Sequence, residues 1–333
     1  CLHVIPVTFL IPGVFLMCCF ISTSIGTSMG TIAAMAPIAI NVAQGAHLNV
    51  AIVGAAVIGG SYFGDNLSMI SDTTIAAVKT QGCEMKDKFK ANFFIVLPAA
   101  IITVLIFWFA TRNMNFHLEE NLSYSLWEVL PYMVVLIGAL IGINVFVVLI
   151  SGIVISLIVG VSMGHIALSE MFQVVGNGVT SMYDITVISI IVACIVSLVK
   201  EHGGIQFILD LIKSKINGRR GAEFGIALLA LFVDACTANN TVAIVMTGPI
   251  AKEISEEFDV DPRRSASLLD MFTSVGQGII PYGAQLLSAA TLTGLTPLQI
   301  IPNLYYPLLM GVCGVLAIIF RPQSKKNYSK VKW

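Results

Sequence analysis

The chain of 333 residues is apolar and carries little charge: 56% of its residues are hydrophobic, 11% are charged, and the formal net charge is -1. About 25% of an ordinary soluble domain is charged, so this composition excludes one, and without a basic excess nothing favours nucleic-acid binding. Several apolar runs have about the 20 residues that a helix needs to cross a bilayer. We therefore expect an all-α, polytopic membrane protein.

Polar, helix-breaking residues recur in two stretches of the chain at an offset of 212 residues. Pro37 corresponds to Pro249, and Gly64 corresponds to Gly276. Such stretches in an otherwise apolar chain point to a transporter site built from broken helices. The sequence therefore predicts two units of one repeat.

The first unit is expected to end within residues 1–122. Its predicted elements are a re-entrant hairpin over 10–39, a broken span over 49–78 and a span over 92–110. The second unit occupies 123–333. It is predicted to contain spans over 126–142, 144–161 and 183–199, a hairpin over 221–251, a broken span over 264–290 and a last span over 303–320.

Basic residues between the apolar runs predict the sidedness. All of the 18 Lys and Arg residues except Arg112 fall into four groups, which are Lys79–Lys90, Lys200–Arg220, Lys252–Arg264 and the tail after Phe320. The positive-inside rule places these groups and the C-terminus in the cytoplasm. On this interpretation no Lys or Arg lies within the membrane.

The number of crossings predicts how the two units are related. Five spans and one hairpin per unit make an odd number of crossings, so the units have opposite orientations and form an inverted repeat. The offset also places roughly 86 residues with three spans before Cys1, by the symmetry of such repeats. We therefore expect the chain to be an N-terminally truncated fragment.

Oxygen-bearing side chains at the predicted turns favour a hard monovalent cation such as Na⁺, because thiolate and imidazole ligands are missing there. Asp65 and Asp72 flank the first break, and an ionisable residue at membrane depth is functional by default. One carboxylate that binds either Na⁺ or a proton is sufficient for exchange, and we predict that Asp65 has this role. The other candidate site residues are Thr27, Ser28, Asn66, Ser68, Asp72, Asp234, Asn239, Asn240, Thr241 and Gln277.

Structural roles remain open for several of these carboxylates. Asp72, followed by two threonines, is suited to capping the second half of the broken helix. Asp234 and Asp270 fit either ion coupling or an interhelical hydrogen bond. No cofactor is expected; the expected partners are Na⁺, protons and the lipid bilayer, and formation of a homodimer stays open.

Two segments resemble the NhaC-type Na⁺/H⁺ antiporter family. Gly26–Thr31 reads G-T-S-M-G-T and Tyr62–Thr74 reads Y-F-G-D-N-L-S-M-I-S-D-T-T, where the family shows G-T-S-x-G-T and Y-F-G-D-x-x-S-x-x-S-D-T-T. Asn66 and Met69 stand where a Lys and a Pro are common. The resemblance implies the ion-transporter superfamily fold, with paired hairpins meeting at the membrane centre, a bacterial plasma membrane location and secondary transport.

The predicted function is therefore Na⁺/H⁺ exchange. The alternative is a Na⁺- or H⁺-coupled carrier or exchanger of a small organic anion or amino acid, because relatives of the family exchange malate for lactate or carry amino acids. An intramembrane aspartyl protease is disfavoured, because Tyr62 occupies the first Gly position of the G-x-G-D motif that such enzymes use and the repeat would have no explanation. We expect a transporter and not an enzyme.

Overall fold

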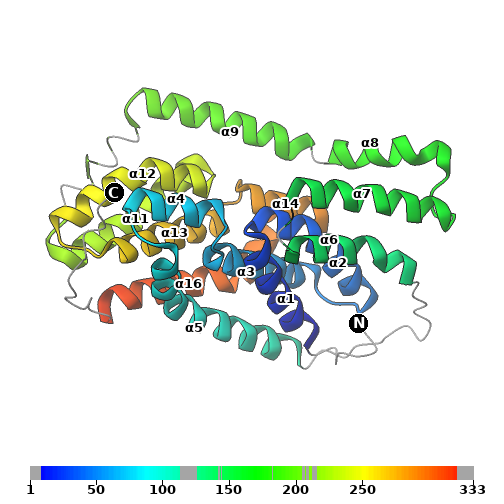
Figure 1. The fold of residues 1–333 in the computed structure, drawn as a ribbon, viewed down its shortest axis with the longest axis horizontal. Helices are drawn as coiled ribbons and strands as arrows, with labels where there is room; N and C mark the ends of the chain where they lie inside the picture. Colours follow the sequence, from blue (N-terminus) through cyan, green and yellow to red (C-terminus); the bar gives the residue numbers. More distant parts are fainter. Residues whose placement is uncertain are drawn as a thin grey trace.

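The computed structural model describes residues 9–112, 126–141, 143, 145–181, 183–204, 207, 210–211 and 216–320. All regular elements in this part of the chain are helices. Most helices run along the long dimension of the molecule, and α8 and α9 lie along one edge of it (Figure 1). The observed architecture is all-α, as the composition predicted.

Two antiparallel helices joined by a two-residue turn open the described chain. They are α1 (Leu10–Ile25) and α2 (Ser28–Gly45). Gly26 ends α1 with a φ of 75°, a left-handed conformation that glycine adopts without steric penalty. Thr27 is extended, and its hydroxyl accepts a hydrogen bond of 3.4 Å from the Gly30 N–H. Local residue types therefore explain the sharp turn.

The next two helices form a broken pair. They are α3 (Val50–Leu67) and α4 (Asp72–Gln81), separated by the segment Ser68–Ser71. Ser68 and Ser71 are both extended, so the helical hydrogen-bond pattern stops between them. The long apolar helix α5 (Met85–Thr111) follows.

The second half of the chain repeats this plan at the level of helix ends. Helix α11 (Gly218–Thr237) is followed by α12 (Asn240–Glu257), α13 (Pro262–Ile279) and α14 (Ala284–Thr293). Helices α12, α13 and α14 begin and end 212 residues after α2, α3 and α4. The left-handed residue Ala238, with a φ of 49°, occupies the place of Gly26 in the turn. The offset found in the sequence therefore extends to backbone conformation.

The remaining helices are apolar or short. Their bounds are α6 Leu126–Ile141, α7 Val145–Ser162, η2 Leu168–Glu170, α8 Met171–Ser181, α9 Tyr183–Glu201, α15 Pro297–Ile300, η3 Ile301–Asn303 and α16 Tyr305–Phe320. The predicted boundary at residue 122 and the basic tail after Phe320 lie outside the described residues.

Length and composition identify membrane-crossing helices among the described residues. Val50–Gln81 and Met85–Thr111 qualify, and Pro297–Asn303 with Tyr305–Phe320 would form a third span bent by 52°. The other predicted spans and the opposite orientation of the two units stay predictions.

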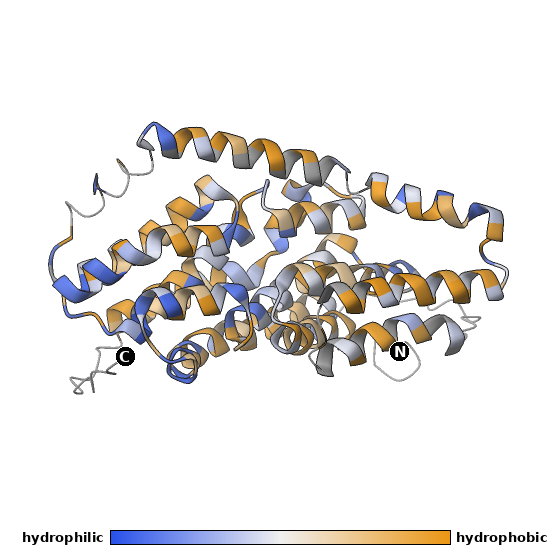
Figure 2. Ribbon diagram, turned by 45° about the horizontal axis from the view of Figure 1, so that its top comes forward, coloured by the Kyte–Doolittle hydropathy of each residue, from blue (hydrophilic) through white to orange (hydrophobic). Residues whose placement is uncertain are grey.

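Apolar side chains face outward and polar ones gather inside. On α5, Phe94, Ile101 and Leu105 are exposed, as lipid-facing residues are. On α13, by contrast, Ser267, Asp270 and Thr273 are fully buried. Figure 2 shows the apolar residues that run along the outer helices α7 and α9. The polar interior is therefore the place to look for a site.

Candidate functional site

Asp65 lies in the last turn of α3 and joins the broken helix pair to the first hairpin. Its Oδ2 accepts a hydrogen bond of 2.7 Å from the Ser28 hydroxyl, at the first residue of α2. Its Oδ1 accepts one of 2.6 Å from the Ser71 hydroxyl, at the end of the break. The side chain is only 3% exposed. The break and the hairpin turn thus converge on one carboxylate.

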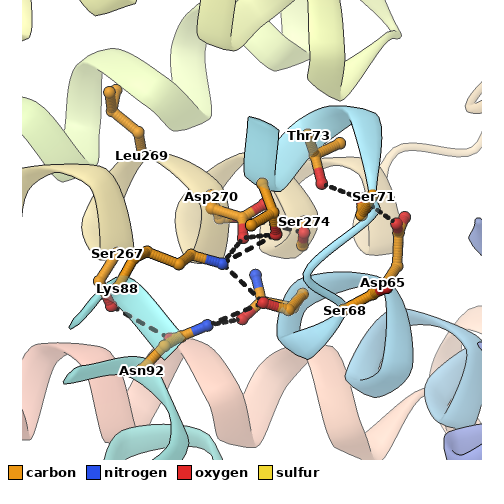
Figure 3. A network of polar contacts seen from close by, with 12 residues as sticks. Asp65, Ser68, Ser71, Thr73, Lys88, Asn92, Ser267, Leu269, Asp270 and Ser274 are labelled. Carbon is orange, nitrogen blue, oxygen red and sulfur yellow. Dashed lines mark hydrogen bonds and ion pairs between the residues drawn. The ribbon is translucent and has the colours of Figure 1, made fainter. Parts of the chain in front are cut away.

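Hydroxyl groups form the polar surroundings of this carboxylate. Ser71 also contacts the Thr73 hydroxyl at 2.8 Å, which extends the chain of hydroxyls into α4 (Figure 3). Among the described residues no Lys or Arg forms a salt bridge with Asp65. Its negative charge is therefore solvated by neutral donors, an arrangement that leaves the site open to a cation or a proton.

A buried lysine lies beside the same break. Lys88, in the first turn of α5, is 1% exposed and forms an ion pair with Asp270 of α13. Its ammonium group also donates to the Asn66 carbonyl at 2.6 Å and to the Thr74 hydroxyl at 3.0 Å (Figure 3). The expectation that no Lys or Arg lies among the membrane helices was therefore wrong for Lys88, because its acceptors come from three other helices.

Asn92, one turn after Lys88, holds the end of α3 in place. Its amide donates to the Asn66 carbonyl at 3.1 Å and also to the Asn66 side-chain oxygen. Ser267 of α13 in turn donates to the Asn92 oxygen at 3.1 Å. The carbonyl freed by the break is therefore paired, as buried irregular backbone requires. Both oxygens of Asn66, a predicted ion ligand, already accept hydrogen bonds.

Each hairpin turn contacts the second helix of the other broken pair. Thr241, at the start of α12, donates to Asp72 Oδ2 of α4 at 2.7 Å. Gln285, at the start of α14, donates to the Ser28 hydroxyl of α2 at 3.3 Å. The two units therefore meet through related pairs of helix ends.

Asp72 itself is exposed and lies at the first position of α4, after the N-cap residue Ser71. Its Oδ1 accepts a hydrogen bond of 3.0 Å from the Thr73 N–H. The structural alternative for Asp72, stabilisation of a helix start, thus accounts for part of its contacts.

The predicted residues of the second hairpin lie together around its turn. Asn239 caps α12 by accepting a hydrogen bond of 3.0 Å from the Val242 N–H. Gln277 donates to the Ala238 carbonyl at 2.9 Å and to the Gln285 oxygen at 2.8 Å. Asn240 is buried, and its amide nitrogen has no hydrogen-bond partner.

Asp234 lies four residues before this turn, on α11. Its side chain is 0% exposed, and neither carboxylate oxygen has a hydrogen-bond partner. It packs against Gly276 of α13, where an added Cβ would lie 2.7 Å from Asp234 Oδ2. Asp234 and Asp270 thus differ, since Asp270 is paired and Asp234 is not.

The structure brings only part of the predicted site into direct contact. Ser28 bonds to Asp65, whereas Thr27 caps α2 and the Ser68 hydroxyl accepts from the Ile70 N–H at 3.3 Å. As ion ligands all of these residues stay predictions. Sequence reasoning missed four polar residues of the network, which are Ser71, Lys88, Asn92 and Gln285.

One signal for the missed residues was present. Lys88 and Asn92 are four residues apart, and Ile95 and Ala99 continue the same helical face into the core. A polar pair at the start of a buried face indicates an internal contact and not a surface loop.

Comparison with known proteins identifies the class. A sequence model of the Na⁺/H⁺ antiporter family matches residues 3–112 and 113–321. The chain belongs to the Na⁺/H⁺ antiporter family. This confirms the resemblance carried by Gly26–Thr31 and Tyr62–Thr74. The protein is therefore a membrane transporter of an antiporter family, and such proteins are not enzymes.

Several relatives of this antiporter have names that specify what they carry. It is 21% identical over 349 residues to the "Malate-2H(+)/Na(+)-lactate antiporter" of Bacillus subtilis (strain 168), a match that covers 94% of this chain and 74% of the relative. It is 21% identical over 348 residues to the "Na(+)/H(+) antiporter NhaC" of Alkalihalophilus pseudofirmus, covering 94% and 75%. It is also 21% identical over 361 residues to the "Arginine/ornithine antiporter ArcD" of Halobacterium salinarum, covering 97% and 74%.

Proposed function

We propose that this antiporter exchanges Na⁺ for H⁺ across the bacterial plasma membrane, and that Asp65 binds the two ions alternately. The observation that carries the proposal is the environment of Asp65. It is a buried carboxylate that receives hydrogen bonds from Ser28 and Ser71 but has no cationic partner among the described residues. Burying a charge without a partner is strongly unfavourable, so binding a proton or Na⁺ stabilises the site.

The balance of buried charges favours a cationic cargo. Three acidic residues are neutralised by basic neighbours, in the pairs Lys88–Asp270, Arg264–Glu223 at 3.1 Å and Arg263–Asp261 at 2.5 Å. Asp65 and Asp234 remain without a cation among the described residues. An interior with excess negative charge attracts small cations and repels anions.

The donor set around Asp65 is suited to Na⁺. Two carboxylate oxygens and the hydroxyls of Ser28 and Ser71 lie within hydrogen-bond reach of one another. Oxygen ligands of this kind match a hard cation. Thr27, Asn66 and Ser68 are neighbours that reorientation of the turn or the break would have to bring in.

Exchange also requires that the site open to each side in turn. We place the two units in opposite orientations, with the second unit and its C-terminus ending in the cytoplasm. The contacts Thr241–Asp72 and Gln285–Ser28 join the hairpin of one unit to the broken pair of the other. Movement of one unit against the other would break and remake these neutral or single-charge contacts at small cost.

Exchange of a small organic anion is the second candidate. Lys88 is the buried cation that such a substrate would need, and one relative is named for malate and lactate. However, the ammonium of Lys88 already donates to Asn66, Thr74 and Asp270. Anion binding would have to displace at least one of these acceptors.

Reconstituted vesicles test the proposal. A Na⁺ pulse should alkalinise or acidify the lumen, according to its direction, without malate, lactate or amino acids present. Asp65→Asn should abolish this response, whereas Asp259→Asn, at an exposed left-handed position that Asn tolerates, should not. A response that appears only when an organic anion is added would favour the second candidate.

Ser71→Ala refines the test of the ligand set. Loss of a hydrogen bond to a charged group costs about 1.5–3 kcal/mol, so half-saturation by Na⁺ should shift about tenfold or more. Ser24→Ala is the matched control, because the Ser24 hydroxyl is exposed and bonds only within α1, to the Phe20 carbonyl at 2.9 Å. Equal half-saturation in the two variants would remove Ser71 from the site.

A further inference from the structure

Asp234 is the second buried carboxylate without a cationic neighbour, and its surroundings differ from those of Asp65. Where Asp65 has two hydroxyl donors, both oxygens of Asp234 lack any hydrogen-bond partner. A fully desolvated carboxylate without donors is far less stable than the protonated acid. The neutral, protonated form therefore fits this position best.

The repeat shows that a carboxylate is not required here for packing. The residue 212 positions before Asp234 is Ser22 on α1, and it packs against Gly64 as Asp234 packs against Gly276. The Ser22 hydroxyl donates to the Ser61 carbonyl at 2.6 Å. A small neutral side chain thus fills the same place in the first unit.

The space beside Asp234 suits a proton better than a metal cation. An added Cβ on Gly276 would lie only 2.7 Å from Asp234 Oδ2, so α13 closes that side of the carboxylate. The nearest hydroxyl of the corresponding pattern, that of Thr273, bonds within α13 to the Leu269 carbonyl at 2.9 Å. Na⁺ needs several oxygen ligands, whereas a proton needs one.

Two tyrosines connect Asp234 to its surroundings. Tyr62 on α3, whose buried hydroxyl has no hydrogen-bond partner, lies in the electrostatic range of both Asp65 and Asp234. Tyr282, between α13 and α14, also lies in range of Asp234 and is 39% exposed, with its hydroxyl donating to the Ala235 carbonyl at 2.7 Å. Asp234 is therefore close to a second carboxylate on one side and to the protein surface on the other.

The charged groups of the helices that pack against α11 leave Asp234 without a counter-ion. Helix α16 has no charged residue, and those of α12 are confined to its last turns. The charged residues of α13, α12 and α9 are Arg263, Arg264, Asp270, Lys252, Glu253, Glu256, Glu257, Asp184, Lys200 and Glu201, and those of α11 itself are Arg219, Arg220 and Glu223. None of the described Lys and Arg side chains forms a salt bridge with Asp234.

We propose that Asp234 is a proton-binding residue of the transport cycle, separate from the cation-binding carboxylate Asp65. The step is a simple protonation: an O–H bond forms on the carboxylate from water on one side and breaks to water on the other. The exchanger then moves one proton more per cycle than Asp65 alone provides. The inference rests on the proposed Na⁺/H⁺ exchange and specifies its proton-to-sodium ratio.

The voltage dependence of exchange tests this inference. If Asp65 exchanges one proton for one Na⁺ and Asp234 adds another proton, transport by the original protein responds to an imposed membrane potential. Asp234→Ser, which copies Ser22, should retain Na⁺-driven proton movement and lose the response to potential. Exchange by the original protein that ignores potential, or an undiminished response in Asp234→Ser, would overturn the inference.

A binding measurement covers variants that do not turn over. Na⁺ added to the detergent-solubilised, weakly buffered protein should release protons, and Asp234→Asn and Asp234→Ser should release about half as many. Unchanged release in both folded variants would overturn the inference. Failure of the proposed function is seen separately, because the original protein would then show no Na⁺-driven proton movement at all.

Discussion

The ammonium group of Lys88 is paired with the carboxylate of Asp270, which lies 182 residues further along the chain. The pair connects α5 of the first unit to α13 of the second, directly beside the break between α3 and α4. Because Lys88 also donates to the Asn66 carbonyl, one side chain holds the two broken helices in register. The core of this antiporter is therefore joined by charge as well as by apolar packing.

Removing one partner of this pair should destabilise the protein strongly. Lys88→Met leaves Asp270 as an unpaired buried charge, and we expect a loss of about 3–5 kcal/mol in the free energy of unfolding. The double variant Lys88→Met with Asp270→Leu should recover much of that loss, because it removes both charges. Lys86→Met, on an exposed position of the same turn, should change stability by at most about 0.5 kcal/mol.

Denaturant unfolding in detergent measures these differences. The account of the pair would be contradicted if Lys88→Met and Lys86→Met unfolded alike, or if the double variant were less stable than Lys88→Met alone.

The two hairpin turns predict opposite effects of related substitutions. Gly26 has a φ of 75°, and an added Cβ would lie 2.7 Å from the Ile70 side chain, so Gly26→Ala should destabilise by more than the roughly 1–2 kcal/mol of left-handed strain. Ala238 already bears that strain at a φ of 49°. Ala238→Gly should therefore stabilise the second hairpin by about 1 kcal/mol.

Gly82 provides the matched control for the turn. Its φ is 70°, but nothing lies within 4 Å of an added Cβ, so Gly82→Ala measures backbone strain without a clash. Thermal melting should rank Ala238→Gly above the original protein, then Gly82→Ala, then Gly26→Ala. A melting temperature of Gly26→Ala equal to that of Gly82→Ala would mean that the contact with Ile70 is unimportant.

The inverted relationship of the units can be tested with one pair of positions. Lys86 and Leu298 are exposed and lie 212 residues apart, so they occupy equivalent places in the two units. An inverted repeat puts equivalent places on opposite sides of the membrane. We expect Leu298→Cys to react with an impermeant maleimide from outside the cell, and Lys86→Cys to react only after permeabilisation.

This labelling needs a background in which the seven native cysteines are replaced. Lys252→Cys serves as a second cytoplasmic marker, since its basic group is expected on the side of Lys86. Reaction of the Lys86 and Leu298 positions from the same side would rule out the inversion.

Features set by local residue types could be predicted from the sequence. The helix ends at Gly26, Thr27 and Asn239 follow from a glycine that tolerates positive φ and from side chains that cap helices. The interruption after Leu67 likewise lies within a short polar segment that contains Ser68 and Ser71. The offset of 212 residues is visible in both the sequence and the helix bounds.

Features set by distant contacts could not be predicted in the same way. The burial of Lys88 depends on Asp270, and the choice of Ser71 over Ser68 as a donor to Asp65 depends on how the chain leaves the break. The lack of partners around Asp234 depends on the side chains that α13 presents. Sequence spacing gives the faces of helices but not the pairing of those faces in three dimensions.

Competition between Na⁺ and protons at Asp65 is the most direct test of the account. In reconstituted vesicles, the Na⁺ concentration for half-maximal exchange should be measured over a range of pH on the Na⁺ side. If one carboxylate binds either ion, this concentration should rise about tenfold for each unit by which the pH falls below the pKa of the site. A half-saturating Na⁺ concentration that stays constant with pH, or exchange that persists in Asp65→Asn, would contradict the shared carboxylate.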